Sequence, residues 1–295
     1  MRLNSKRVAI AAVAASALAG LAPGIAGADD PPQFREYYSI FERGQAKIPH
    51  IAPEHYVPQG LAYWPERDQM ILSYYDDRGG KALLSFLDRA TSKPVKSVYL
   101  DGKIHAGTLT MSKNYLWVSA TSDAGRQVFR YAKSALDSAG NGATVTKDKA
   151  YTLKASSVME IYGDKFYVGQ FNSKTSDKMY RYAMTSAEEP AKTPEHSFTI
   201  PSKTQGVTIT PNRFFYSRSA GRDKPSEIDA QPAGKPIDKK LVAPNMAEDM
   251  ATVNGQLYII YESGARKYGD ASYKVRTVHH GKAFARGAAE SNVIW

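Results

Sequence analysis

The chain has 295 residues, a formal net charge of +10 at pH 7 and no cysteine. The absence of cysteine excludes disulfides, thiolate metal sites, cysteine nucleophiles and haem attached through cysteine. A basic protein tends towards anionic surfaces. The Lys and Arg residues are scattered, however, with no basic run interleaved with stacking aromatic residues, so the sequence argues against nucleic-acid binding.

The first 28 residues predict a secretory signal peptide. They begin with basic residues, continue with an apolar run (8–21) and end in small residues suited to cleavage (26–28). A membrane span needs about 20 unbroken apolar residues, and Pro23 closes the run before that, so we expect cleavage and no membrane anchor. The expected mature chain, residues 29–295, keeps a net charge of +7, is secreted and acts as a monomer outside the cell.

A strand–turn–strand pattern recurs along the mature chain. Its five copies are spaced 47, 51, 48 and 43 residues apart, taking as equivalent positions Gly60, Gly107, Val158, Gly206 and Asp249. A period of this size, with several short strands in each unit, is typical of a β-propeller, in which four-stranded blades pack around an axis. The sequence therefore predicts one all-β domain, a five-bladed β-propeller.

The predicted strands follow in chain order. Residues 36–41 are rich in strand-forming residues and stand before the first repeat, with no partner inside it. Each of the first three blades offers four short strands, at 60–64, 70–75, 83–88 and 95–100, at 108–111, 116–120, 127–131 and 150–153, and at 159–162, 166–171, 179–182 and 197–200. The long connection 132–149 includes a segment, 134–137, typical of a helical turn.

The last two repeats are less regular. Residues 220–240 of the fourth are rich in Pro, Gly, Asp and Lys and offer only one weak strand, so a mobile linker is favoured over a functional loop. The fifth offers three strands, at 250–253, 256–262 and 273–279, the first two joined by an Asn-Gly hairpin turn. We expect strand 36–41 to be its fourth strand, because closing the ring leaves no open sheet edge.

Several segments resemble known propeller proteins, among them PQGLAY (58–63), HAGTLT (105–110), TQGVTIT (204–210) and LYIIYESGARKY (257–268). They are similar to a family of exported, mostly uncharacterised propeller proteins of Gram-positive bacteria, which implies the fold and no particular reaction. A weaker similarity is to the five-bladed plant-type glutaminyl cyclases, whose first repeat carries Gln-Gly-Leu before a strand that ends in Glu-Ser-Thr-Gly. Gln59, Gly60 and Leu61 match the first piece, whereas residues 73–77 replace the second and lack its glutamate.

Every repeat places a polar side chain just before its innermost strand, at Gln59, His105, Ser157, Gln205 and Glu248. The innermost strands of a propeller line its axial channel, so we expect these five residues, here called the mouth ring, to meet at one channel mouth and bind a ligand by hydrogen bonds. The alternative is that polar residues at a crowded axis simply meet channel water.

Catalysis at this mouth would need an acid and a base with separated pKa values. The best candidates are His105 as base and Glu248 as acid, with Asp249 or Glu160 in reserve.

Glu262 stands at a strand end in the fifth repeat, four residues before Arg266. In one interpretation Glu262 binds a ligand at the channel mouth and Arg266 binds an anionic group. In the other, which we favour here, the two residues form a charge pair that holds the turn.

The sequence predicts no metal site and no cofactor. A lactonase-type propeller site binds a divalent ion through several carboxylate and amide oxygens, and the mouth ring offers too few carboxylates. His279 and His280 are adjacent on a strand, so they point to opposite faces and do not share a metal. No phosphate-binding loop, nucleophile elbow or His-Glu-x-x-His motif is present.

These patterns favour a secreted binding module with a small ligand, a glycan or a surface protein at the channel mouth, and anionic cell-wall polymers as further partners. The alternative is a secreted enzyme of the glutaminyl cyclase or lactonase type. The chemistry of the channel mouth distinguishes the binding module from the enzyme. A buried carboxylate with a raised pKa beside His105 would favour the enzyme, and an open wet ring would favour binding.

Overall fold

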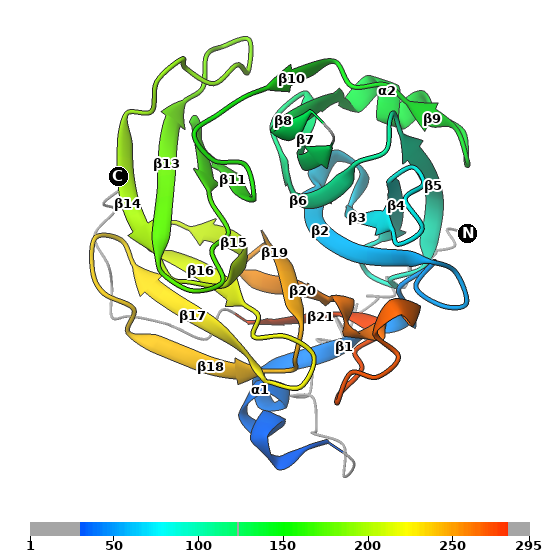
Figure 1. Ribbon diagram of the computed structural model, residues 1–295, viewed down its shortest axis with the longest axis vertical. Coiled ribbons are helices and arrows are strands. Elements are labelled where there is room, and N and C mark those ends of the chain that lie inside the picture. The colour runs from blue at the N-terminus through cyan, green and yellow to red at the C-terminus, as the bar shows by residue number, and fades with distance from the viewer. Residues whose placement is uncertain (1–29, 123, 283–295) are drawn as a thin grey trace, which may run out of the picture.

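The computed structural model describes residues 30–122 and 124–282, and the predicted signal peptide lies outside this part of the chain. Figure 1 shows five twisted sheets arranged around a central axis. The four strands of each blade run antiparallel in chain order from the axis outward, apart from the blade that contains both ends of the domain, and the short β9 adds a parallel strand at the edge of the first blade. The predicted five-bladed β-propeller is confirmed.

The first blade contains β2 (Tyr56–Trp64), β3 (Gln69–Asp76), β4 (Leu83–Asp88) and β5 (Pro94–Leu100), with η2 (Pro65–Arg67) between its first two strands. The second contains β6 (His105–Met111), β7 (Tyr115–Ser122), β8 (Gly125–Ala132) and β10 (Lys149–Tyr151). Between β8 and β10 the chain forms the expected helical turn, α2 (Lys133–Ser138), and then β9 (Thr144–Val145), which pairs in parallel with β5 at the edge of the first blade.

The third blade contains β11 (Val158–Tyr162), β12 (Lys165–Gly169), β13 (Asp177–Ala183) and β14 (His196–Ile200). The fourth contains β15 (Thr204–Thr210), β16 (Arg213–Arg218), β17 (Ser226–Pro232) and β18 (Lys239–Ala243). The last contains β19 (Ala247–Val253), β20 (Gln256–Tyr261), β21 (Thr277–Lys282) and β1 (Phe41–Lys47), and the 3-10 turns η3 (Glu262–Gly264) and η4 (Arg266–Tyr268) follow β20.

The N-terminal segment closes the ring, but not through residues 36–41. These residues form most of the helix α1 (Arg35–Ile40), which follows η1 (Pro32–Phe34), and the closing strand is β1, which pairs with β21. Four buried aromatic residues explain the error, because their spacing is helical: Phe34, Tyr37, Tyr38 and Phe41. Their β-forming side chains suggested a strand, and burial of one helical face decided the outcome.

A buried hydrogen-bonded chain fixes α1 on the last blade. The Tyr261 hydroxyl donates to the Tyr37 hydroxyl at 2.8 Å, and the Tyr37 hydroxyl contacts His279 Nδ1 at 2.8 Å. Burial lowers the pKa of His279 to about 3, so the imidazole is neutral and accepts a hydrogen bond from the Tyr37 hydroxyl. Both ends of the described chain are therefore held in one sheet.

The fourth blade is complete, so the prediction of a linker over residues 220–240 is wrong. The strand β17 lies within this segment and β18 begins at its end, both in regular antiparallel register. Arg218 on β16 explains why the pattern was hidden, since its guanidinium contacts Glu227 Oε2 at 2.5 Å and Asp229 Oδ2 at 3.0 Å. Cross-strand ion pairs satisfy polar residues that a hydrophobic pattern would exclude from a strand. The third strand of the last blade likewise begins later than predicted, at Thr277.

Glycine lets the innermost strands approach one another. A Cβ on Gly60 would lie 2.2 Å from the Gly107 carbonyl oxygen, and one on Gly206 would lie 2.6 Å from the Asp249 Cα atom. Both distances are shorter than any real contact, so no larger residue fits without moving the backbone. The sequence equivalence of these positions thus has a physical cause. No helix among the described residues has the length and apolarity needed to cross a membrane.

Candidate functional site

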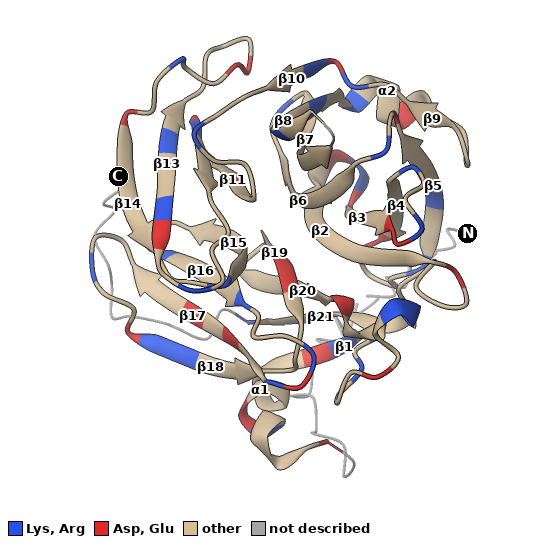
Figure 2. Ribbon diagram, viewed as in Figure 1, with Lys and Arg blue, Asp and Glu red and all other residues tan. Residues whose placement is uncertain are grey.

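The mouth ring residues lie together at one end of the channel. A cavity of about 170 Å³ is lined by all five predicted residues, Gln59, His105, Ser157, Gln205 and Glu248. Each comes from a different blade: Gln59 lies three residues into β2, and the other four lie at or next to the start of the innermost strand. Figure 1 shows these innermost strands around the axis. Figure 2 shows the acidic start of β19 at the axis, whereas Lys and Arg colour outer strands such as β13 and β18. We call this space the mouth cavity.

Two carboxyl groups form the chemical centre of the mouth. Glu248 is only 4% exposed, and its Oε1 atom has no hydrogen-bond partner among the described residues. Its carboxyl is hydrogen-bonded to that of Glu262, and Gln59 Nε2 donates to Glu262 Oε2 at 3.0 Å. Burial raises the pKa of both carboxyls, that of Glu248 well above its ordinary value, and the negative charge of Glu262 raises it further.

The two carboxyls, Glu248 and Glu262, differ in the hydrogen-bond donors around them. Gln59 and Tyr268 both hydrogen-bond Glu262 and lower its pKa, whereas for Glu248 every interaction raises the pKa. Two carboxyls in contact hold one proton because both cannot ionise at short range. We therefore assign the proton to Glu248 and the negative charge to Glu262. This is the arrangement of an acid and a base in contact.

His105 stands at the rim of the mouth cavity. Its ring stacks on Tyr75 at a centroid distance of 4.4 Å, and Lys267 Nζ donates to the Tyr75 hydroxyl at 2.8 Å. Desolvation by the neighbouring atoms lowers the pKa of His105, and the positive charge of Lys267 lowers it further. The residue still keeps a solvent-exposed edge. The neutral imidazole can exchange a hydrogen bond with a ligand at the rim.

The remaining mouth ring residues supply amide and hydroxyl groups. The Ser157 hydroxyl accepts a hydrogen bond from Gln170 Nε2 at 3.2 Å, and the Ser157 carbonyl accepts one from the Thr108 hydroxyl at 3.2 Å. No side-chain hydrogen bond joins Gln205 to any other residue of the described chain. Its amide is therefore available to a ligand as both donor and acceptor.

Asp249, a reserve candidate for catalysis, is a structural residue. Its Oδ2 atom accepts the backbone N–H groups of Leu61 and Leu109, each at 2.9 Å, and Oδ1 accepts its neighbour Met250 N–H at 3.0 Å. Burial raises the pKa of Asp249 while these three donors oppose the rise. The carboxyl ties together the innermost strands of three blades. Glu160, the other reserve candidate, lies outside the mouth cavity and lines a second cavity.

The interpretation of Glu262 and Arg266 as a charge pair is wrong. Arg266 Nη1 contacts His55 Nε2 at 2.9 Å and the Pro53 carbonyl at 3.4 Å, and no ion pair joins it to Glu262 in the described part of the chain. Glu262 instead lies behind the mouth ring, where it accepts a hydrogen bond from Gln59, and it does not itself line the mouth cavity. With Ser263 and Gly264 it forms a Glu-Ser-Gly sequence directly after the second strand of the last blade, beside Gln59 of the first.

Besides Gly107, five residues of the mouth cavity were not predicted as site residues: Thr108, Ser119, Thr121, Arg126 and Phe171. Thr108 lies on an innermost strand, and the other four come from second and third strands or the turns beside them. The sequence pattern marked equivalent polar positions at the innermost strands only, so it gave no signal for side chains that reach inward from the next strands. Arg126 adds a positive charge at the mouth, which can contact an anionic or carbonyl group of a ligand.

No group of three His, Cys, Asp or Glu residues within 30–122 and 124–282 is placed to hold a metal ion. The absence of a metal site and of a cofactor stays a prediction. His279 and His280 do point to opposite faces of β21, since His279 contacts Tyr37 and His280 stacks on Tyr258 at 5.5 Å.

No protein-family model and no curated protein matches the chain. Among solved structures, glutaminyl cyclase from Myxococcus xanthus is similar with a TM-score of 0.55 and 9% identity, covering 82% of this chain and 97% of that chain. A GH43 β-xylosidase/α-arabinofuranosidase from a compost microbial metagenome gives 0.53 and 7%, covering 82% and 95%. A GH43 enzyme from Xanthomonas citri gives 0.50 and 12%, covering 82% and 91%. At these identities the likeness shows the propeller fold alone.

Proposed function

We propose that the mouth cavity is the active site of a secreted acid–base enzyme. The observation that carries the proposal is the Glu248–Glu262 pair, a buried carboxylic acid in contact with a carboxylate, with Glu248 Oε1 free of any partner in the described chain. A protein that used this ring only for stability would satisfy such an atom, because an unpaired buried polar group is costly. Perturbed titrating groups in a cavity are characteristic of catalytic sites.

The size of the cavity restricts the substrate. A volume of about 170 Å³ is below the roughly 300–1,000 Å³ of pockets that bury drug-sized ligands. The space admits one residue-sized group and excludes a long internal chain segment. Gln59, Gln205 and Arg126 line it with amide and guanidinium groups that match carbonyl and amide partners.

Cyclisation of an N-terminal glutaminyl residue is the reaction that we assign first. The Gln-Gly-Leu sequence at residue 59 and the Glu-Ser-Gly sequence at residue 262 resemble the two pieces of the plant-type cyclases, and Gln59 and Glu262 are hydrogen-bonded. The glutamate that the first blade lacks is thus supplied in space by the last blade. The fold likeness to the Myxococcus xanthus enzyme is consistent with this assignment.

The proposed step needs only proton transfers. The substrate α-amino nitrogen forms a bond to the side-chain amide carbon, and the bond from that carbon to the amide nitrogen breaks. Glu262, as carboxylate, accepts the proton from the attacking amine, and Glu248, as acid, donates its proton to the leaving nitrogen, which departs as ammonia. The hydrogen bond between the carboxyls then returns the proton to Glu248.

A binding module is the second candidate, and the unpartnered Gln205 amide favours it. In that case the mouth would hold a small ligand, a glycan or a surface protein, without turnover. Secretion belongs to both proposals and rests on the predicted signal peptide.

The test is to incubate the mature chain with peptides that begin in glutamine and to follow ammonia release and peptide mass. We expect turnover in the wild type and a loss of at least about 100-fold in Glu248→Gln and Glu262→Gln, the range for a positioned acid or base. Glu36→Gln, an exposed carboxyl on α1, is the control and should be unchanged. A wild type without turnover would contradict the cyclase, and saturable peptide binding would then favour the module.

A further inference from the structure

A second and larger cavity lies on the axis beyond Asp249. It measures about 510 Å³ and is lined by the far ends of the innermost strands, among them Leu61, Leu109, Glu160 and Ala251. The mouth cavity is lined by the preceding residues of the same strands, such as Gln59 and Gly107. The two spaces therefore open at opposite ends of the channel, and no residue lines both. We call this space the far cavity.

The walls of the far cavity are apolar over much of their area. Leu61 and Leu109 lie at its inner end, and Met111, Ile161 and Met184 lie along its sides. Such walls exclude water from an alkyl chain and supply adaptable contacts through the two methionines. A purely polar ligand, such as a sugar or an inorganic ion, would make no apolar contact with these walls.

The charge of the far cavity is opposite to that of the protein. Its lining holds four carboxyls and two lysines, although the chain has a formal charge of +10. The rim carboxyls already have partners: Glu66 binds Lys133 at 2.8 Å, Glu188 accepts the side-chain amide of Asn114 at 2.6 Å, and Asp164 lies 3.5 Å from Lys165. The remaining carboxyl is that of Glu160.

Glu160 lies on the innermost strand β11 and lines the far cavity together with Leu61 and Leu109. Its hydrogen-bond partner is the Thr110 hydroxyl, which in turn accepts Ile161 N–H at 2.9 Å. No Lys or Arg of the described chain forms an ion pair with Glu160. Burial, and then the charge of Asp249, raise the pKa of Glu160, and a cation placed beside this part-buried carboxyl would favour its charged form.

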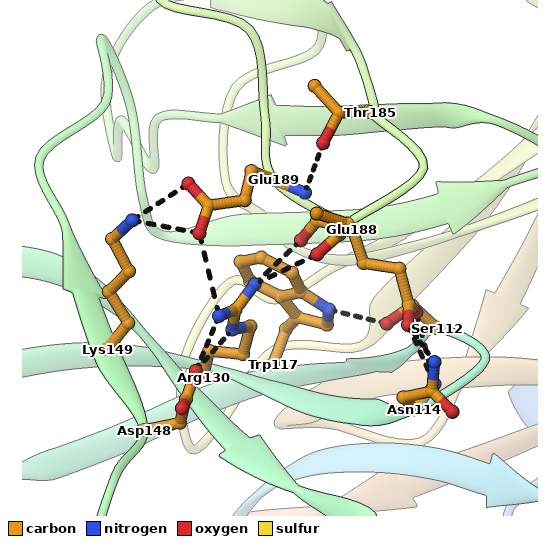
Figure 3. A network of polar contacts seen from close by, with 10 residues as sticks. Ser112, Asn114, Trp117, Arg130, Asp148, Lys149, Thr185, Glu188 and Glu189 are labelled. Atoms are coloured by element: carbon orange, nitrogen blue, oxygen red, sulfur yellow. Dashed lines mark hydrogen bonds and ion pairs between the residues drawn. The ribbon is translucent and has the colours of Figure 1, made fainter.

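The rim of the far cavity is held open by the network in Figure 3. Arg130 contacts Asp148 Oδ2 at 2.5 Å and donates to the Glu188 carbonyl at 2.9 Å, while its guanidinium lies 4.0 Å above the Tyr115 ring. These contacts fasten the β13–β14 loop, which carries Met184 and Glu188, to the second blade. The cavity is therefore preformed and does not depend on a ligand to hold the loop in place.

We propose that the far cavity binds a primary alkylammonium group, such as a diamine or the end of a lysine side chain. The ammonium group lies on Glu160 beside the Thr110 hydroxyl, and the alkyl chain lies along Met111, Ile161 and Met184. A divalent metal is a poorer match, since it requires six or more oxygen ligands and this part of the structure has no group of three candidate ligands. The inference is independent of the reaction assigned to the mouth.

The test uses the mature chain labelled with ¹³C at the methionine methyl groups, titrated with 1-aminopentane and 1,5-diaminopentane. Signals of Met111 and Met184, assigned through M111L and M184L, should shift saturably, while the buried core residues Met179 and Met250 keep their signals. The matched neutral ligand is 1-pentanol, and calcium chloride is the metal comparison. No saturable shift with the amines, an equal response to pentanol, or a stronger response to calcium would each overturn the proposal.

Two variants locate the charge. Glu160→Gln keeps the shape of the side chain and removes its charge, so amine affinity should fall at least tenfold. Asp164→Asn makes the same change at the exposed rim, where the side chain is 79% exposed, and should alter affinity less than twofold. Equal affinity in wild type and Glu160→Gln would contradict the assignment, and if Glu160→Gln fails to fold, the comparison of amine with pentanol in the wild type decides.

Discussion

The mouth of the axial channel and its centre carry neighbouring buried carboxyls with opposite surroundings. At the centre, Asp249 accepts three backbone N–H groups from three strands. At the mouth, Glu248 leaves one oxygen without a partner in the described chain, and burial, followed by the charge of Glu262, raises the pKa of its carboxyl. The difference teaches that burial alone does not mark a functional acid. A satisfied carboxyl holds the blades together, and an unsatisfied one is available for chemistry.

The largest expected effect is the loss of stability when the Asp249 carboxyl at the centre of the channel is removed. Asp249→Ala leaves the N–H groups of Leu61, Leu109 and Met250 without their acceptor, and each buried orphan costs about 1–3 kcal/mol, so we expect a loss of about 4 kcal/mol or more in the free energy of unfolding. Urea denaturation measures it. Glu248→Gln, one residue away, is the matched comparison and should change stability by less than about 1 kcal/mol at pH 5. Similar losses in both variants would abolish the distinction.

Crowding at the centre gives the next largest effect. Gly60→Ala places a Cβ 2.2 Å from the Gly107 carbonyl oxygen, and overpacking of this kind costs about 1–3 kcal/mol. Gly140→Ala is the control, because a Cβ there meets nothing within 4 Å and its backbone is not left-handed. Thermal unfolding should show a lowered Tm for the first variant and an unchanged or higher Tm for the second. Equal Tm values would mean that the innermost strands can separate without cost.

Closure of the ring gives a third, smaller effect. Tyr37→Phe removes the hydroxyl between Tyr261 and His279 and leaves both partners buried, so we expect a loss of about 1–2 kcal/mol in unfolding free energy. Tyr162→Phe, which has no hydrogen-bond partner for its hydroxyl among the described residues, should change stability by less than about 0.5 kcal/mol. Equal losses would show that the helix α1 is held by apolar packing alone.

The pH dependence of stability gives the smallest effect and sharpens the contrast at the mouth. The pKa of Glu248 is raised in the folded state, so its contribution is fully present below the ordinary glutamate pKa and is lost as pH rises towards the folded pKa. Glu248→Gln cannot ionise. Its unfolding free energy should therefore fall less steeply than that of the wild type between pH 5 and 8, by at most about 1.4 kcal/mol per pH unit. Parallel curves would mean that Glu248 ionises equally well in both states.

The sequence period predicted the architecture and the five residues of the mouth ring, because equivalent positions in a closed ring must meet. It could not predict that Glu262 contacts Gln59, since that contact joins the second strand of the last blade to the first blade across 203 residues. The helix α1 was missed because tyrosine and phenylalanine favour strands as well as buried helical faces. The strand β17 was predicted only as a weak strand and β18 was missed, because ion pairs from Arg218 allow polar residues in a sheet.

The most direct test of the central claim is the titration of Glu248 itself. NMR of the mature chain labelled with ¹³C at the glutamate carboxyls follows its ionisation, with the Glu248 signal assigned by its absence in Glu248→Gln. We predict that this carboxyl loses its proton well above the ordinary glutamate value of about 4.3 and at a higher pH than Glu262. A Glu248 signal that titrates at the ordinary value would contradict the shared proton and the acid–base function built on it.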